Sequence, residues 1–156
     1  MDIADSTINR LIQHPYNEAI CRYILANKPS AHSDLTEELD KISATLPAHK
    51  NYCPNPASYA YVILVTNSDK IFAAACGMST LLFNLPAEEF AQACTDGGES
   101  FADLPDEWVG FRAFRVDRSL TANRKSLRHW CQIAFVKASQ DGNDDEKSVI
   151  GKENGV

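Results

Sequence analysis

The sequence predicts an α+β domain in which an antiparallel sheet of about four strands is flanked by helices. Three observations support this fold class. Apolar residues recur at helical spacing near both ends of the chain, the middle contains short β-branched and aromatic runs, and turn residues separate these runs. A chain of 156 residues with 44% apolar content can bury an ordinary core as one domain. We expect this single domain to occupy residues 1–139.

Two helices are predicted before the sheet begins. Residues 6–27 carry apolar side chains at helical spacing, and Pro15 kinks or divides this helix, so residues 1–30 are expected to form a helical extension. Asp34 and Glu37 resemble a capping box that opens the second helix. The apolar face of this second helix consists of Leu35, Leu39, Ile42 and Leu46.

A proline-rich stretch separates these helices from the predicted strands. Residues 46–56 contain three prolines, which predicts an irregular crossing loop. Residues 58–66 and 70–76 are β-branched or apolar runs joined by Asn-Ser-Asp, and this pattern predicts a hairpin. Residues 79–85 form the third predicted strand.

Two helices and one strand complete the predicted domain. Pro86 and the acids after it open a helix at 87–95, which Gly97 and Gly98 end. Residues 107–116 predict a fourth strand with a basic edge. The last helix has a clear apolar stripe, formed by Leu127, Trp130, Cys131, Ala134, Phe135 and Ala138. Residues 140–156 are polar and predict a disordered acidic tail.

The cysteines and the N-terminus indicate the compartment. The five cysteines form no CxxC or CxH pair and their number is odd, which is typical of reduced thiols in a cytoplasmic protein. The N-terminus carries acids where a signal peptide has basic residues, and no apolar run approaches the roughly 20 residues that span a bilayer. We therefore expect a cytoplasmic protein without a membrane partner.

The charges are segregated along the chain. Residues 86–107 contain seven acids and no base, while residues 112–137 contain seven bases and one acid. The two stretches either face each other in the fold or form separate surfaces, and a separate basic surface is suited to an acidic partner or to phosphate. The candidate partner-binding residues are Arg112, Arg115, Arg124, Lys125 and Arg128.

No catalytic or metal-binding motif is recognisable. His129 and Cys131 lie two residues apart on one predicted helix, so their side chains diverge by about 200° and cannot form a nucleophile–base pair. Cys131 is expected in the core, as are Trp108 and Trp130. The remaining histidines, His14, His32 and His49, are expected in solvent, without metal-ligand spacing. We predict no catalytic residue, no metal and no cofactor.

Several short runs carry a resemblance to a known family. They are Lys70-Ile71-Phe72-Ala73, Leu82-Phe83, Leu85-Pro86 with Glu88-Glu89, Gly97-Gly98, Trp108-Val109 and residues 127–138. Over residues 34–138 this pattern resembles the MmcQ/YjbR and TfoX N-terminal type of domain. The resemblance implies an antiparallel sheet flanked by helices and a non-enzymatic or regulatory protein, with nucleic-acid binding proposed for some members. The chain departs from the family pattern in its helical extension, its proline-rich loop and its acidic charge.

Three functions follow from these observations. The first is a non-enzymatic interaction or regulatory module that contacts an unknown protein or a second copy of itself. The alternative is a nucleic-acid-binding regulatory domain that uses residues 112–137, although a net charge of −6 disfavours binding to phosphate backbones. The third is a thiol-dependent or small-molecule enzyme.

Overall fold

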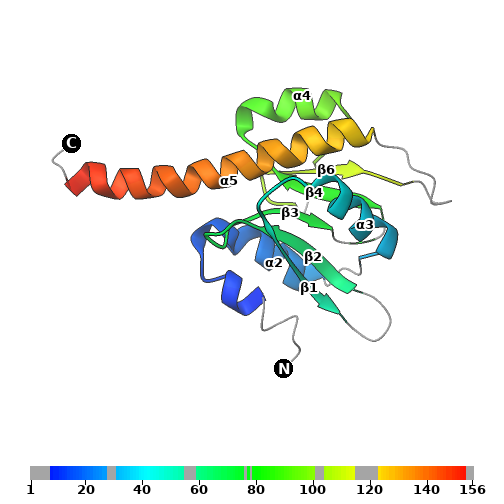
Figure 1. Ribbon diagram of the computed structural model, residues 1–156, viewed down its shortest axis with the longest axis horizontal. Helices are drawn as coiled ribbons and strands as arrows, with labels where there is room; N and C mark the ends of the chain where they lie inside the picture. The colour runs from blue at the N-terminus through cyan, green and yellow to red at the C-terminus, as the bar shows by residue number, and fades with distance from the viewer. Residues whose placement is uncertain are drawn as a thin grey trace.

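The computed structural model describes residues 8–27, 31–54, 59–75, 77, 79–100, 104–114 and 123–153, with the backbone alone for 27, 51–54, 59–62 and 141–153. It confirms the predicted α+β class: helices cover a sheet in which all pairings are antiparallel (Figure 1). Within the described residues this sheet has six strands, two more than the sequence predicts, in the order β1-β2-β3-β4-β6-β5. The strands are β1 (His49–Pro54), β2 (Tyr59–Val65), β3 (Ile71–Ala75), β4 (Thr80–Asn84), β5 (Gly98–Glu99) and β6 (Trp108–Arg112).

The two additional strands are β1 and β5, at the two edges of the sheet. β1 lies inside the predicted crossing loop, so that prediction is wrong there. The prolines are compatible with β1 because Pro47 precedes it, Pro54 ends it, and an edge strand tolerates a missing N–H donor. β5 consists of two residues after α4, which is too short to produce a periodic signal.

The helical elements are η1 (Pro15–Asn17), α2 (Glu18–Asn27), α3 (Ser33–Ile42), η2 (Ala87–Glu89), α4 (Phe90–Thr95) and α5 (Arg124–Glu153), and residues 8–11 are also helical. Pro15 separates residues 8–11 from α2, as predicted. α3 is shorter than predicted and ends before Leu46. His32, not the predicted Asp34, caps it, because His32 Nδ1 accepts a hydrogen bond from the Asp34 N–H at 3.0 Å.

The N-terminal helical segment, residues 8–27, packs on one face of the sheet. The buried side chains of this layer are Ile8, Leu11, Ile20, Cys21 and Ile24, and they pack on Ile63, Val65, Ile71, Ala74, Leu82 and Trp108. Residues 8–27, which lie within the predicted helical extension of residues 1–30, thus form a layer of the domain. β2 has no polar face, and it needs such a layer on each side.

Asn17 fixes this layer to β3 by hydrogen bonds. Its Nδ2 donates to the carbonyl oxygens of Leu11 at 3.0 Å and Asp69 at 2.6 Å, and its Oδ1 accepts from the Ile71 N–H at 2.7 Å. The side chain is fully buried. A single amide thus satisfies three backbone groups between the N-terminal segment and the sheet.

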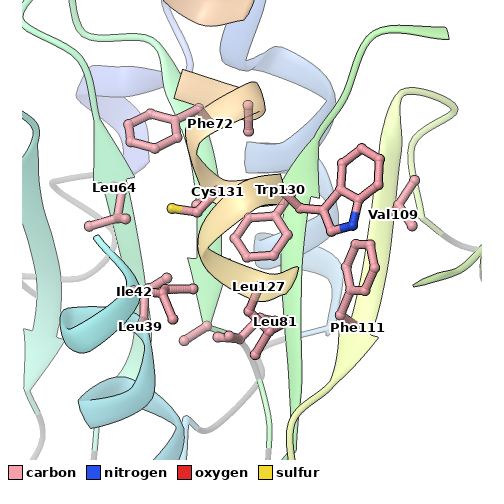
Figure 2. Packing of buried hydrophobic residues seen from close by; sticks show 14 of the residues in the cluster. Leu39, Ile42, Leu64, Phe72, Leu81, Val109, Phe111, Leu127, Trp130 and Cys131 are labelled. Carbon is pink, nitrogen blue, oxygen red and sulfur yellow. The ribbon is translucent and has the colours of Figure 1, made fainter. Parts of the chain in front are cut away.

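The opposite face of the sheet is covered by α3 and α5 (Figure 2). Trp130 points toward Val109 and Phe111, whereas Cys131 points toward Leu64 and Phe72. The predicted apolar stripe of the last helix is confirmed, since Leu127, Trp130, Cys131, Ala134 and Ala138 are buried and Phe135 is partly buried against the same cluster. Burial of each large apolar side chain contributes roughly 1.5–3 kcal/mol.

α5 continues to Glu153, across residues for which the sequence predicts a disordered tail. Its second half extends beyond the sheet in Figure 1. The packed first half supplies a formed helix nucleus, and adding residues to an existing helix costs far less than starting one. The segment contains no proline that would stop this propagation.

Candidate functional site

The acidic and basic stretches meet at Lys137 of α5. Its Nζ donates to Glu107 Oε1 at 3.0 Å, to Asn84 Oδ1 at 2.6 Å and to the Leu85 carbonyl oxygen at 3.0 Å. The Lys137 side chain is only 10% exposed. Of the two arrangements that the sequence left open, internal pairing of the stretches therefore occurs at this point.

Arg124 has a structural role. Its guanidinium forms a bidentate ion pair with Glu38 of α3, with Nε at 2.6 Å from Oε2 and an Nη nitrogen at 2.9 Å from Oε1. The Glu38 side chain is 3% exposed, and the hydrogen bond to this carboxylate, with its charge, raises the pKa of Arg124 above its ordinary value. Arg124 thus joins the start of α5 to α3.

The other candidate partner-binding residues that the structure describes come from two elements, β6 and α5. Lys125 and Arg128 are exposed on the first turns of α5. Arg112, also exposed, ends β6 and borders a hollow of about 320 Å³ that includes Asn123 and Ser126 at the start of α5. Arg115 lies outside the described residues.

A larger groove, about 720 Å³, lies between α5 and the segment that enters α4. We call it the α5 groove. One wall is a single stripe of α5, since its residues recur at positions i, i+3, i+4, i+7, i+8 and i+11: His129, Gln132, Ile133, Val136, Lys137 and Gln140. The other wall consists of Pro86, Ala87, Glu88, Glu89 and Glu107.

The α5 groove combines apolar surface with negative charge. Ile133 is partly buried, and Val136 is 40% exposed, the one large apolar side chain with that exposure among those that the structure describes. Three glutamates border these side chains, while the single ammonium, Lys137, is held by Glu107 and two neutral acceptors. The groove is thus suited to a ligand with both apolar and cationic groups.

The two buried thiols, Cys21 and Cys131, are poorly suited to nucleophilic chemistry. Burial raises the pKa of Cys21 and of Cys131 to about 12, so both remain protonated at neutral pH. Cys131 is in the core, as predicted, while the neighbouring His129 is exposed, so they form no dyad. Cys94 is exposed on α4. Cys76 and the side chain of Cys53 lie outside the described part of the chain.

The histidines predicted to be in solvent also serve as local hydrogen-bond partners; His49 is exposed, and His14 and His32 are half-buried. His14 caps η1 as His32 caps α3, through an Nδ1 that accepts the Tyr16 N–H at 3.1 Å. His49 Nε2 lies 2.6 Å from Asn67 Oδ1. Unprotonated imidazole nitrogen accepts a hydrogen bond as an Asn or Asp side-chain oxygen does, which explains these caps.

The two tryptophans are in the core, as predicted. Trp108 and Trp130 are both buried, and Trp130 Nε1 donates to Asp96 Oδ2 at 3.0 Å. Among the described residues, no three His, Cys, Asp or Glu side chains gather closely enough to hold a metal ion. No helix in this part of the chain combines the length and the apolar character needed to cross a bilayer.

Comparisons with protein-family models, with curated proteins and with solved structures give no match to this chain. The resemblance to the MmcQ/YjbR and TfoX N-terminal type of domain thus stays a prediction. The α5 groove itself was missed by the sequence analysis. The available signal was the pair Ile133 and Val136, two apolar residues that lie off the predicted buried stripe of the last helix.

Proposed function

We propose that this chain is a non-enzymatic interaction module, regulatory in character, that binds a protein partner in the α5 groove. The observation that carries the proposal is Val136, an exposed apolar side chain on the α5 wall of a groove whose other wall presents three glutamates. Exposed apolar surface within a polar border is typical of protein-binding sites.

Binding suits the α5 groove better than catalysis does. Catalytic acids and bases are usually held in desolvated sites, whereas Glu88 and Glu107 are exposed and Glu107 is 67% accessible. No Ser, Thr or Cys stands among the described residues that line the groove, so His129 has no side-chain nucleophile to activate there.

The nucleic-acid alternative has less support. Two of the bases in the segregated stretch, Arg124 and Lys137, already neutralise Glu38 and Glu107. Exposed Lys125 and Arg128 remain on α5, on a chain whose net charge is −6. Retention of DNA or RNA at low salt that is lost on reversing these two charges would favour the alternative.

Site-specific photocrosslinking in cells of the source organism tests the proposal. A benzophenone amino acid replaces Val136 in the full chain, and the matched control carries the same group at Arg22, an exposed position on α2 over the opposite face of the sheet. We expect discrete protein adducts from position 136 and not from position 22. Equal labelling from both positions, or no adduct from position 136, would refute the proposal.

A further inference from the structure

We propose that the segment bound in the α5 groove is a short, basic amphipathic helix of a protein partner. This inference rests on the proposed function. Three features of the groove carry it: the length of the α5 stripe, the placement of the carboxylates and the nature of the two walls.

The first feature is length. The stripe of α5 that lines the groove extends from His129 to Gln140. Eleven steps of about 1.5 Å give a wall about 16 Å long, which matches three turns of a second helix. Ile133 and Val136 lie near the middle of this wall, where apolar side chains at i and i+3 or i+4 of a bound helix can contact them.

The second feature is charge. Glu88 and Glu89 stand on the wall opposite α5 and, among the described residues, neither has an ion-pair partner. Of the three glutamates in the groove, Lys137 forms an ion pair with Glu107 only. The groove therefore presents a net negative wall opposite the apolar side chains of the α5 wall. Lys and Arg side chains on the polar face of a bound helix complement that negative wall, while phosphate groups of a nucleic acid or an acidic membrane are repelled by it.

The third feature is the secondary structure of the two walls. A bound extended segment gains most of its affinity from backbone hydrogen bonds to a free sheet edge. The α5 groove offers no such edge, because its walls are the helix α5, the short helix η2 and a connecting segment. Backbone groups within a helix are already bonded, so side-chain packing has to supply the contacts. Helix-in-groove binding works in this way.

A designed peptide and two charge-reversed variants test the inference. The probe is a fluorescent 14-residue peptide of Leu and Lys, with Leu at helical spacing on one face. Its controls are a scrambled peptide of the same composition and a peptide with Glu in place of Lys. The groove variant is Glu88→Lys with Glu89→Lys. The matched protein variant is Glu18→Lys with Glu37→Lys, two exposed positions on α2 and α3. Each of these two double substitutions changes the net charge of the chain by four, from −6 to −2.

Fluorescence anisotropy measures the binding of each peptide to each protein. We expect the amphipathic basic probe to bind the native chain, and the groove variant to weaken that binding by about tenfold or more, with the matched variant changing it less than about twofold. Equal weakening by both variants, equal binding of the scrambled or acidic peptide, or no binding of the basic probe would overturn the inference.

The outcomes separate this inference from the proposed function. A protein adduct from position 136 whose crosslinked segment is not a basic helix overturns the inference and leaves the proposed function standing. Failure of position 136 to give a specific adduct refutes the proposed function itself.

Discussion

Lys137→Met tests how the acidic and basic stretches are joined. Methionine keeps a flexible apolar side chain that can follow the lysine stem, but it has no donor for the three acceptors around Nζ. Asn84 Oδ1 and the Leu85 carbonyl oxygen then lose the hydrogen bond that the structure shows, and both residues are buried. The Glu107 carboxylate, which is exposed, can turn to water.

The expected loss in the free energy of unfolding follows from these two acceptors. A buried polar group left without its partner costs about 1–3 kcal/mol, so loss of the donor to both acceptors should lower the free energy of unfolding by about 2–6 kcal/mol. In a domain of this size each kcal/mol lowers Tm by about 2–4 °C, which gives a decrease of roughly 4–24 °C. The exposed ion pair to Glu107 adds less than about 1 kcal/mol.

Urea and thermal unfolding measure this effect. The matched control is Lys125→Met, the same substitution at an exposed position of α5, for which we expect a change within about 0.5 kcal/mol. Glu107→Gln should also be mild. The Lys137→Met penalty should persist in 1 M NaCl, because salt screens exposed charges and not buried hydrogen bonds. If Lys137→Met is as mild as Lys125→Met, or if high salt removes the difference, the reasoning is refuted.

Four further predictions concern the packing of the domain and its cysteines. Asn17→Leu leaves three backbone partners unsatisfied and should lower the free energy of unfolding in urea by about 3 kcal/mol or more; a loss under about 1 kcal/mol would contradict the role of this amide. Gly98→Ala places a Cβ 2.6 Å from Val109 Cγ1 and 2.8 Å from the Ala93 carbonyl oxygen. The near-ultraviolet circular dichroism of Trp130, which is hydrogen-bonded to the end of α4, should therefore change. An unchanged spectrum and Tm would show that the site relaxes freely. Iodoacetamide at pH 8 should modify Cys94 in the native protein and leave Cys21 and Cys131 unmodified, as mass spectrometry of peptides can show. Because burial raises the pKa of these two thiols from 9.0 to about 12, the stability they contribute is present below pH 9 and is lost as the pH rises to 12; urea titrations that show no decline over that range would contradict this.

The fold class was predictable because the strongest patterns are local. The apolar run of β2 and the stripe of α5 each identify their element without knowledge of the rest of the chain. β2 also carries a signal for the position of the N-terminal helices. A strand without a polar face needs cover on both sides, and Ile63 and Leu64 do contact opposite layers. The N-terminal helices could have been assigned to the second layer on this ground.

The candidate site was less predictable because its contacts join distant parts of the chain. Arg124 pairs with a glutamate 86 positions away, and Lys137 with one 30 positions away. A count of charges along the sequence cannot distinguish such paired bases from exposed ones. The groove depends in the same way on tertiary structure, because Glu88 and Val136 become neighbours only when α5 packs on the sheet.

Lys137 contributes both to the stability of the fold and to the charge of the α5 groove. Its replacement is therefore expected to lower the stability and to raise the affinity for the basic peptide. Lys137→Met removes the only lysine or arginine among the described residues that line the groove, so the groove becomes more negative while the domain becomes less stable. At 10 °C without denaturant, where the variant remains folded, we expect it to bind the amphipathic basic peptide more tightly than the native chain, by a factor that shrinks as salt is added. Anisotropy measures the affinity, and circular dichroism of the same samples confirms folding. If binding weakens together with stability in a folded variant, then charge does not recruit the peptide, and shape alone governs the groove.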